Sequence, residues 1–187
     1  MRVIAGSARR MTLKTPKGDD TRPTQDRIKE TLFNIIQNEV PGSVFVDLFA
    51  GSGGIGIEAL SRGAKRAYFV ENGSIPAACI AENLNHTHLA DRAVILRQDV
   101  VQALRNIREK EVDIVYIDPP YGDDQYLRTL VQLGRAGYIS GNTMIIVECP
   151  AGSELDIEGE TEFTIVREKN YKSNRHLFLG RKKGNDL

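Results

Sequence analysis

The chain has 187 residues, of which 41% are hydrophobic, and its 25 basic and 25 acidic residues give a formal net charge of zero. This length allows one domain with a sizeable core and leaves little room for a second. A zero net charge argues against a protein that coats nucleic acid without selectivity, because affinity for phosphates needs concentrated positive charge.

Residues 1–40 predict an N-terminal extension that packs on the main fold. Its first part, residues 2–14, reads as a short extended element with glycine punctuation. A helix follows, with Thr24 as its cap, and continues to about residue 38. The main fold is then expected over residues 41–187, so that the whole chain forms one structural domain.

A glycine-rich turn follows the first apolar strand. Residues 44–48 are an apolar segment with Asp47 near its end, and Gly51 to Gly54 lead from it into a helix over residues 55–62. Glycines let the backbone approach a ligand closely, which is the anatomy of a nucleotide site. A dehydrogenase could carry the same turn. Asp47 nevertheless favours the cationic methionyl part of adenosylmethionine, because a carboxylate there would repel a pyrophosphate.

Two further predicted strands also end in acidic residues. Residues 67–70 are followed by Glu71, about twenty residues beyond the glycines, where an acid can bind ribose hydroxyls in either cofactor class. Residues 93–96 lead to Asp99, whose carboxylate suits an adenine amino group. An aspartate in front of a helix, here residues 100–107, is more often an ordinary N-cap.

The stretch Asp118-Pro119-Pro120-Tyr121 follows the apolar run of residues 112–117, where a buried parallel strand would end. Two prolines make the loop stiff and push Asp118 into an extended conformation. Asp118 and the Pro119 carbonyl would then accept hydrogen bonds from a nucleobase amine and aim its lone pair, while Tyr121 offers a ring for stacking. The alternative is a turn that merely ends a strand, with Tyr121 covering the core.

The four acids predict a single site. In an open α/β sheet, ligands bind at the carboxyl ends of the strands, where Asp47, Glu71, Asp99 and Asp118 would all lie. Strand and helix alternate after residue 40, as a doubly wound parallel sheet requires. The remaining elements are expected as a helix over residues 123–135, a strand over 143–148 and an antiparallel hairpin over 161–168 and 175–181.

Further blocks surround these motifs: residues 1–6, 22–24 with Asp26-Arg27, 32–35, 58–64 and 69–71. Together with the glycine turn and the Asp-Pro-Pro-Tyr stretch, they cover nearly the whole chain. They resemble the class I adenosylmethionine-dependent methyltransferases and, more narrowly, the RsmD family, which methylates the N2 amine of one guanine in bacterial 16S ribosomal RNA. The block at residues 22–24 discriminates, because the other two motifs occur in many methyltransferases. After Tyr171 the chain has Lys172, where we expect a glycine.

The resemblance implies a Rossmann-like α/β fold with a mostly parallel seven-stranded sheet flanked by helices. It implies S-adenosyl-L-methionine as the cofactor, and 16S rRNA or the small ribosomal subunit as the partner. The implied cofactor-binding residues are Asp47, Gly51, Gly53, Glu71, Asn72 and Asp99. The implied catalytic residues are Asp118, Pro119, Pro120 and Tyr121, which would hold the target guanine.

Basic residues gather at both ends of the chain. Residues 1–18 hold five cations and no acid, and the C-terminal end, from Arg167 onward, is also rich in lysine and arginine. Charge runs are usually solvated surface. With the resemblance, they predict an RNA-binding surface that includes Arg9, Arg10, Arg22 and Arg27.

The sequence predicts neither a metal site nor a membrane segment. Cys79 and Cys149 lack the spacing of a disulfide framework or a zinc site, and His86 and His88 read as surface or capping residues. With no apolar stretch of membrane-spanning length and no apolar signal region, a cytoplasmic protein is expected. Nothing in the sequence points to a protein partner.

Two other functions remain open. A DNA adenine-N6 methyltransferase would use the same Asp-Pro-Pro-Tyr loop, although such enzymes normally need a target-recognition domain for which this chain has no obvious room. A binding protein of the same fold that has lost its chemistry is the second alternative. Intact acids at four strand ends argue against it.

Overall fold

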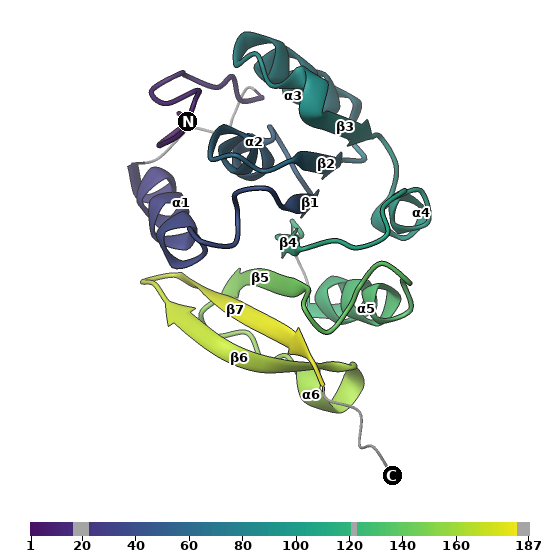
Figure 1. Cartoon of the computed structure of the whole chain (residues 1–187). Helices are drawn as coiled ribbons and strands as arrows, with labels where there is room; N and C mark the ends of the chain where they lie inside the picture. The colour runs from purple at the N-terminus through teal and green to yellow at the C-terminus, as the bar shows by residue number, and fades with distance from the viewer. Residues whose placement is uncertain (17–22, 121–122, 183–187) are drawn as a thin grey trace.

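The computed structural model describes residues 1–16, 23–120 and 123–182. Within these residues it contains a seven-stranded sheet in the order β3-β2-β1-β4-β5-β7-β6 (Figure 1). The first five strands of the sequence pair in parallel, and β7 pairs antiparallel with both β5 and β6. The predicted α/β fold, with a mostly parallel sheet and a C-terminal antiparallel hairpin, is therefore confirmed.

The strands are β1 (Val44–Leu48), β2 (Arg66–Val70), β3 (Ala93–Leu96), β4 (Ile114–Ile117), β5 (Met144–Pro150), β6 (Phe163–Asn170) and β7 (Asn174–Arg181). The helices are α1 (Pro23–Ile35), α2 (Gly54–Ser61), α3 (Ser74–His86), α4 (Val100–Leu104), α5 (Asp123–Gly134) and α6 (Ile157–Glu160), with a 3-10 turn η1 (Ala90–Arg92).

Helices cover both faces of the sheet (Figure 1). One face packs against α1, α2, α3 and residues 1–14, and the other packs against α4, α5 and α6. All residues of the central strands β1 and β4 are therefore buried. That explains why these two strands are nearly continuous apolar runs rather than alternating segments. Asp47 is the exception to the apolar pattern of β1.

Two predicted helices differ from the structure by more than one residue at an end. α1 begins at Pro23, so Thr24 lies inside the first turn and not at the cap, in keeping with the preference for proline at the first helical position. The helix ends at Ile35 instead of residue 38: Ile36 N still bonds four residues back, to Leu32 O, and the chain then turns, with Glu39 N bonded three residues back, to Ile36 O. α4 ends at Leu104 for the same reason, through the bond from Arg105 N to Gln102 O.

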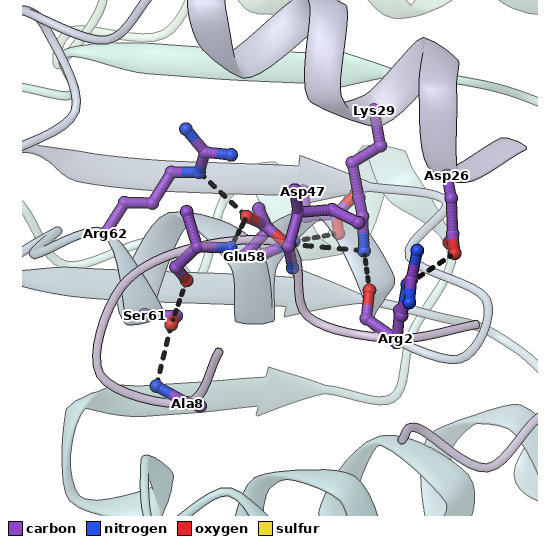
Figure 2. A network of polar contacts seen from close by, with 11 residues as sticks. Arg2, Ala8, Asp26, Lys29, Asp47, Glu58, Ser61 and Arg62 are labelled. Carbon is purple, nitrogen blue, oxygen red and sulfur yellow. Dashed lines mark hydrogen bonds and ion pairs between the residues drawn. The ribbon is translucent and has the colours of Figure 1, made fainter. Parts of the chain in front are cut away.

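The N-terminal segment, residues 1–14, folds back on itself and is held against α2 by a buried carboxylate (Figure 2). An antiparallel bridge joins Arg2 to Thr12. Glu58 of α2 has no exposed surface, and its two oxygens accept hydrogen bonds from the backbone amides of Ile4 and Ala5, at 2.8 and 3.0 Å. Because unpaired buried charges are costly, the two cations beside this carboxylate are part of the attachment.

Those cations are Lys29 of α1 and Arg62. The Lys29 ammonium lies 3.4 Å from Glu58, and the Arg62 guanidinium lies 2.7 Å from it (Figure 2). Lys29 also donates a 2.7 Å hydrogen bond to the Arg2 carbonyl. Glu58 thus ties the N-terminal segment, α1 and α2 together, which fixes where the first arginines of the chain lie.

Candidate active site

A cavity of about 550 Å³ opens where the parallel strands β1 to β4 end. This is the edge at which the sequence predicts a site, and the cavity has the size of a small-molecule pocket. Of the predicted site residues, Gly51, Glu71, Asn72, Asp99, Asp118 and Pro120 all line it. Residues from four separate strand ends are therefore brought together in one place.

The glycine turn between β1 and α2 forms one wall of the cavity. Phe49 lines it and has a φ of 63°, a conformation that a bulky residue rarely adopts. Gly51 also has a positive φ, and a side chain added there would meet no atom within 4 Å. Local strain in a non-glycine residue is a feature of binding sites, and here it aims the turn at the cavity.

Two predicted cofactor residues lie behind this wall. Gly53 is buried and is the N-cap of α2, with a φ of 83°, and neither it nor Asp47 lines the cavity. Asp47 accepts a 2.9 Å hydrogen bond from the Gly56 amide. Burial and, to a smaller extent, the charge of Glu71 raise the pKa of Asp47 to about 7. A direct contact between Asp47 and a cofactor therefore stays a prediction.

The acid at the end of β2 is held in place by the backbone. Glu71 accepts hydrogen bonds from the amides of Gly51 and Gly73, at 2.9 and 2.7 Å. The carboxylate thus joins the glycine turn to the start of α3, beside the exposed Asn72. Both residues present polar atoms to the cavity.

Asp99 is both the cap of a helix and part of the cavity wall. Its carboxylate accepts a 3.1 Å hydrogen bond from Gln102 N, so it is the N-cap of α4. It also lines the cavity. An N-cap uses one oxygen for the helix, and the second remains available for a ligand.

Asp118 follows β4 directly and is exposed to the cavity, whereas Pro119 is buried and Pro120 is exposed. The neighbouring protein desolvates the Asp118 carboxyl group, and the charges of Glu148 and Asp47 lie nearby; these effects raise its pKa to about 8. Solvent in the cavity screens both effects. Tyr121 lies outside the described residues.

A second cavity, of about 590 Å³, lies between the N-terminal segment and α1. We call it the basic cleft; it is lined by Arg2, Val3, Ile4, Arg9, Arg10, Asp26, Arg27 and Glu30. The three predicted RNA-binding residues Arg9, Arg10 and Arg27 therefore share one cleft, and all three are exposed. The fourth, Arg22, lies outside the described residues.

The basic cleft adjoins the glycine turn. Gly54, the first residue of α2, packs so closely on Met1 that an added Cβ would lie 2.1 Å from the Met1 sulfur. Arg2 is the next residue along the chain, and its guanidinium lies 3.3 Å from Asp26. The start of the chain therefore packs on the first residue of α2, one residue before the first arginine of the basic cleft.

Sequence reasoning missed several residues that line the first cavity. Phe49 gives no signal in the sequence, because its importance lies in its backbone conformation. Gln98 stands next to Asp99 at a strand end and could have been found by that position. Gln125, Arg128 and Thr129 follow helical spacing on α5 and form a polar stripe facing the site.

Neither a metal site nor a membrane-spanning helix is found in the described part of the chain. Among those residues, no three His, Cys, Asp or Glu side chains are gathered as a metal ion would require. No helix formed by the described residues is long and apolar enough to cross a membrane.

The strand order and a cavity at the carboxyl ends of the parallel strands define a Rossmann-like α/β fold with a ligand site. A solved structure described as a putative methyltransferase, yhhF, from Escherichia coli superposes with a TM-score of 0.81 and 29% identity, covering 97% of this chain and 98% of that one. The family described as "Conserved hypothetical protein 95" matches residues 1–180, and the chain belongs to this family, the RsmD family of methyltransferases.

Two curated relatives agree with this assignment. One, named putative rRNA methyltransferase YlbH, from Bacillus subtilis, is 34% identical over 173 residues, covering 91% of this chain and 94% of that protein. The other, named ribosomal RNA small subunit methyltransferase D, from Haemophilus influenzae, is 33% identical over 171 residues, with 90% and 88% covered.

Proposed function

We propose that this enzyme transfers a methyl group from S-adenosyl-L-methionine to the N2 amine of a guanine in 16S ribosomal RNA. The observation that carries the proposal is the convergence of Glu71, Asp99 and Asp118 on one cavity in a chain of the RsmD family. The ribosomal substrate is supported by the names of the relatives.

The donor set of the cavity fits adenosylmethionine. Glu71 has a fixed carboxylate of the kind that accepts hydrogen bonds from ribose hydroxyls. The free oxygen of Asp99 suits an adenine amine, and the apolar side chains of Phe49 and Val100 line the same cavity. Asp47, behind the glycine turn, adds negative charge that favours a cationic sulfonium.

Asp118 and the loop after it would hold the target base. A guanine N2 is a poor nucleophile, because its lone pair is delocalised into the ring. If Asp118 and the Pro119 carbonyl accept its two N–H bonds, they orient that lone pair and keep the nitrogen closer to tetrahedral. The loop is suited to this task because its two prolines fix it.

The bound cofactor supplies an activated methyl group, so the protein needs no covalent intermediate. What its residues contribute is alignment of the amine and a place for the proton that the amine loses. Asp118 is the acidic group at the predicted position of the amine. We therefore assign it both the orienting hydrogen bond and the proton.

The basic cleft would hold RNA phosphates close to the cavity. Its four arginines outnumber its two acids, Asp26 and Glu30, although the net charge of the whole chain is zero. Local positive charge is what phosphate binding requires.

The test is transfer of a labelled methyl group from adenosylmethionine to three acceptors: small ribosomal subunits lacking the modification, naked 16S rRNA and duplex DNA. The proposal expects label in subunits or RNA and none in DNA. Label in DNA adenine would favour the adenine-N6 enzyme. Cofactor binding without any transfer would favour a binding protein that has lost its chemistry.

A further inference from the structure

A buried polar network lies beside Asp118 at the carboxyl end of β5. The register of β4 and β5 ends with the pair Ile117 and Val147. The next residues along the two chains are Asp118 and Glu148, whose carboxyl groups interact electrostatically. Glu148 does not line the cavity, and its side chain is 20% exposed. Asp118 thus lines the cavity at this strand end, and Glu148 lies outside the cavity lining.

Three side chains donate hydrogen bonds to the Glu148 carboxylate. The Tyr116 hydroxyl and His176 Nε2 bond to one oxygen, the latter at 2.8 Å, and the Asn174 amide bonds to the other. Because Glu148 holds three donors and does not line the cavity, it is not placed to take a proton from a substrate. It can act only through its charge and through the groups it holds.

The network continues into the hairpin of β6 and β7. His176 is fully buried, and its Nδ1 lies 3.0 Å from the Tyr171 hydroxyl. Because Nε2 faces a carboxylate it carries a proton, and in the neutral ring Nδ1 then accepts from Tyr171. Glu148 therefore fixes the start of β7 and, through His176, the turn at residues 171–173.

We propose that Glu148 is a positioning residue that makes Asp118 a better proton acceptor for the substrate amine. This role rests on the proposed function. In the step concerned, the bond from N2 to the methyl carbon forms and the bond from sulfur to that carbon breaks, with the electron pair going to sulfur. The N2 nitrogen, now positively charged, loses one proton to the Asp118 carboxylate, which then releases it to solvent.

Charges around both groups support this division of roles. Burial alone would raise the pKa of Glu148, but its hydrogen bonds from His176, Tyr116 and Asn174 outweigh burial and lower it. Glu148 therefore stays ionised and repels a second negative charge at Asp118, so that, after burial, it is the next largest cause of the raised pKa of Asp118.

Other charged groups also face Asp118. Asp47 of β1 adds to the repulsion, and Tyr116 of β4 is a neutral neighbour whose pKa burial raises further. Glu71, Asp99 and Arg128 line the same cavity from β2, α4 and α5. Of these groups, Glu148 is the carboxylate that can be neutralised without touching the cavity wall or the glycine turn.

The experiment compares Glu148→Gln with Glu148→Asp. Glutamine keeps the shape of the side chain and loses the charge. If the Asn174 amide group rotates, its Oδ1, which is buried without a hydrogen-bond partner, can accept a bond from the glutamine amide. Aspartate keeps the charge and shortens the side chain. Titration of the Asp118 carboxyl carbon by NMR in the ligand-free protein, assigned with Asp118→Asn, measures the coupling without any catalysis.

We expect Glu148→Gln to lower the Asp118 midpoint by about one pH unit and to shift the acid limb of the methyl-transfer profile in the same direction. Glu148→Asp should leave the midpoint near that of the unmodified protein, even if it lowers thermal stability. Adenosylmethionine affinity should change less than twofold in either variant.

An Asp118 midpoint that is the same in Glu148→Gln and in the unmodified protein would overturn the role of Glu148. So would equal shifts in both variants, since those would follow shape and not charge. Failure of the unmodified enzyme to methylate RNA contradicts the proposed function instead, and the titration distinguishes that failure from the first.

Discussion

At the scale of single residues, the proposed methyl transfer depends most on Asp118. We propose that it contacts the substrate amine, whereas Glu71 and the glycine turn, which line the same cavity from other strand ends, are assigned to the cofactor. A residue that acts only on the acceptor can be removed without disturbing the donor. This division of roles gives the first prediction.

Asp118→Ala should abolish methyl transfer while adenosylmethionine affinity stays within a few-fold, because the alanine variant loses both the orienting hydrogen bond and the proton acceptor. Isothermal titration measures the affinity, and single-turnover assays measure the transfer. Glu71→Ala is the matched control, for which the affinity should fall. If Asp118→Ala also lost cofactor binding, Asp118 would belong to the cofactor site.

The raised pKa of Asp47 predicts how the stability of the folded protein changes with pH. Its pKa is raised from 3.8 to about 7 in the folded protein. Between these two values the folded state holds a proton that the unfolded state has lost, so stability falls as the pH rises through this window. Asp47→Asn keeps an acceptor for the Gly56 amide and cannot ionise. Its melting temperature, relative to the unmodified protein, should therefore increase from pH 4 to pH 7.

Thermal melts at several pH values test this prediction, with Asp91→Asn as the control at an exposed aspartate outside the site. The control should differ from the unmodified protein by the same amount at every pH. Parallel curves for Asp47→Asn and the unmodified protein would mean that burial does not raise the pKa of this group.

At the scale of elements, the N-terminal segment is held to α2 by close packing as well as by Glu58. Gly6 has a φ of +83°, and a Cβ added there would lie 1.8 Å from the Ser61 carbonyl oxygen. Ser61 also bonds to this segment, through Ala8 N at 3.0 Å and Ala5 O at 2.6 Å. No side chain fits at residue 6 unless the segment moves away.

Gly6→Ala should therefore destabilise the protein by about 1–3 kcal/mol. Chemical unfolding measures this change. Gly137→Ala is the matched control, because a Cβ there meets no atom within 4 Å, and its stability should be nearly unchanged. Equal effects of the two substitutions would show that the contact with Ser61 does not constrain the segment.

The elements also show what the sequence could and could not predict. The parallel strands have buried, apolar patterns, and their shared carboxyl edge brings Glu71, Asp99 and Asp118 together, so the cavity could be predicted from the order of motifs. The ends of α1 and α4 could not, because they are set by three-residue turns without a sequence marker.

Contacts between distant residues were also beyond the sequence. Glu58 bonds to Ile4, 54 positions away, and Glu148 bonds to His176, 28 positions away. Both acids follow apolar residues in the sequence, where the residue type alone does not reveal a partner. Only the fold shows that each has several donors.

At the scale of the whole molecule, a protein with zero net charge binds RNA only if its cations are concentrated. The basic cleft concentrates them, and it adjoins the glycine turn through Met1. Cations at the amino ends of the parallel strands should contribute far less. Lys65, Arg108 and Lys110 precede β2 and β4 at those ends and are exposed.

Replacing Arg9, Arg10 and Arg27 with alanine should raise the Michaelis constant for RNA and flatten its salt dependence. Each lost phosphate contact lowers the slope of log affinity against log salt by about 0.7 for a single strand. The control replaces Lys65, Arg108 and Lys110 and should keep the slope of the unmodified enzyme. Equal slopes for the two triple variants would remove the cleft from the RNA-binding surface.

The central claim concerns one atom of one base, so the decisive measurement is nucleoside analysis, by mass spectrometry against standards, of 16S rRNA methylated by the purified enzyme. We expect the unmodified enzyme to form N2-methylguanosine and the Asp118→Ala variant to form none. A methyl group on a ring nitrogen, on a ribose or on adenine would contradict the assignment of Asp118 to a guanine amine.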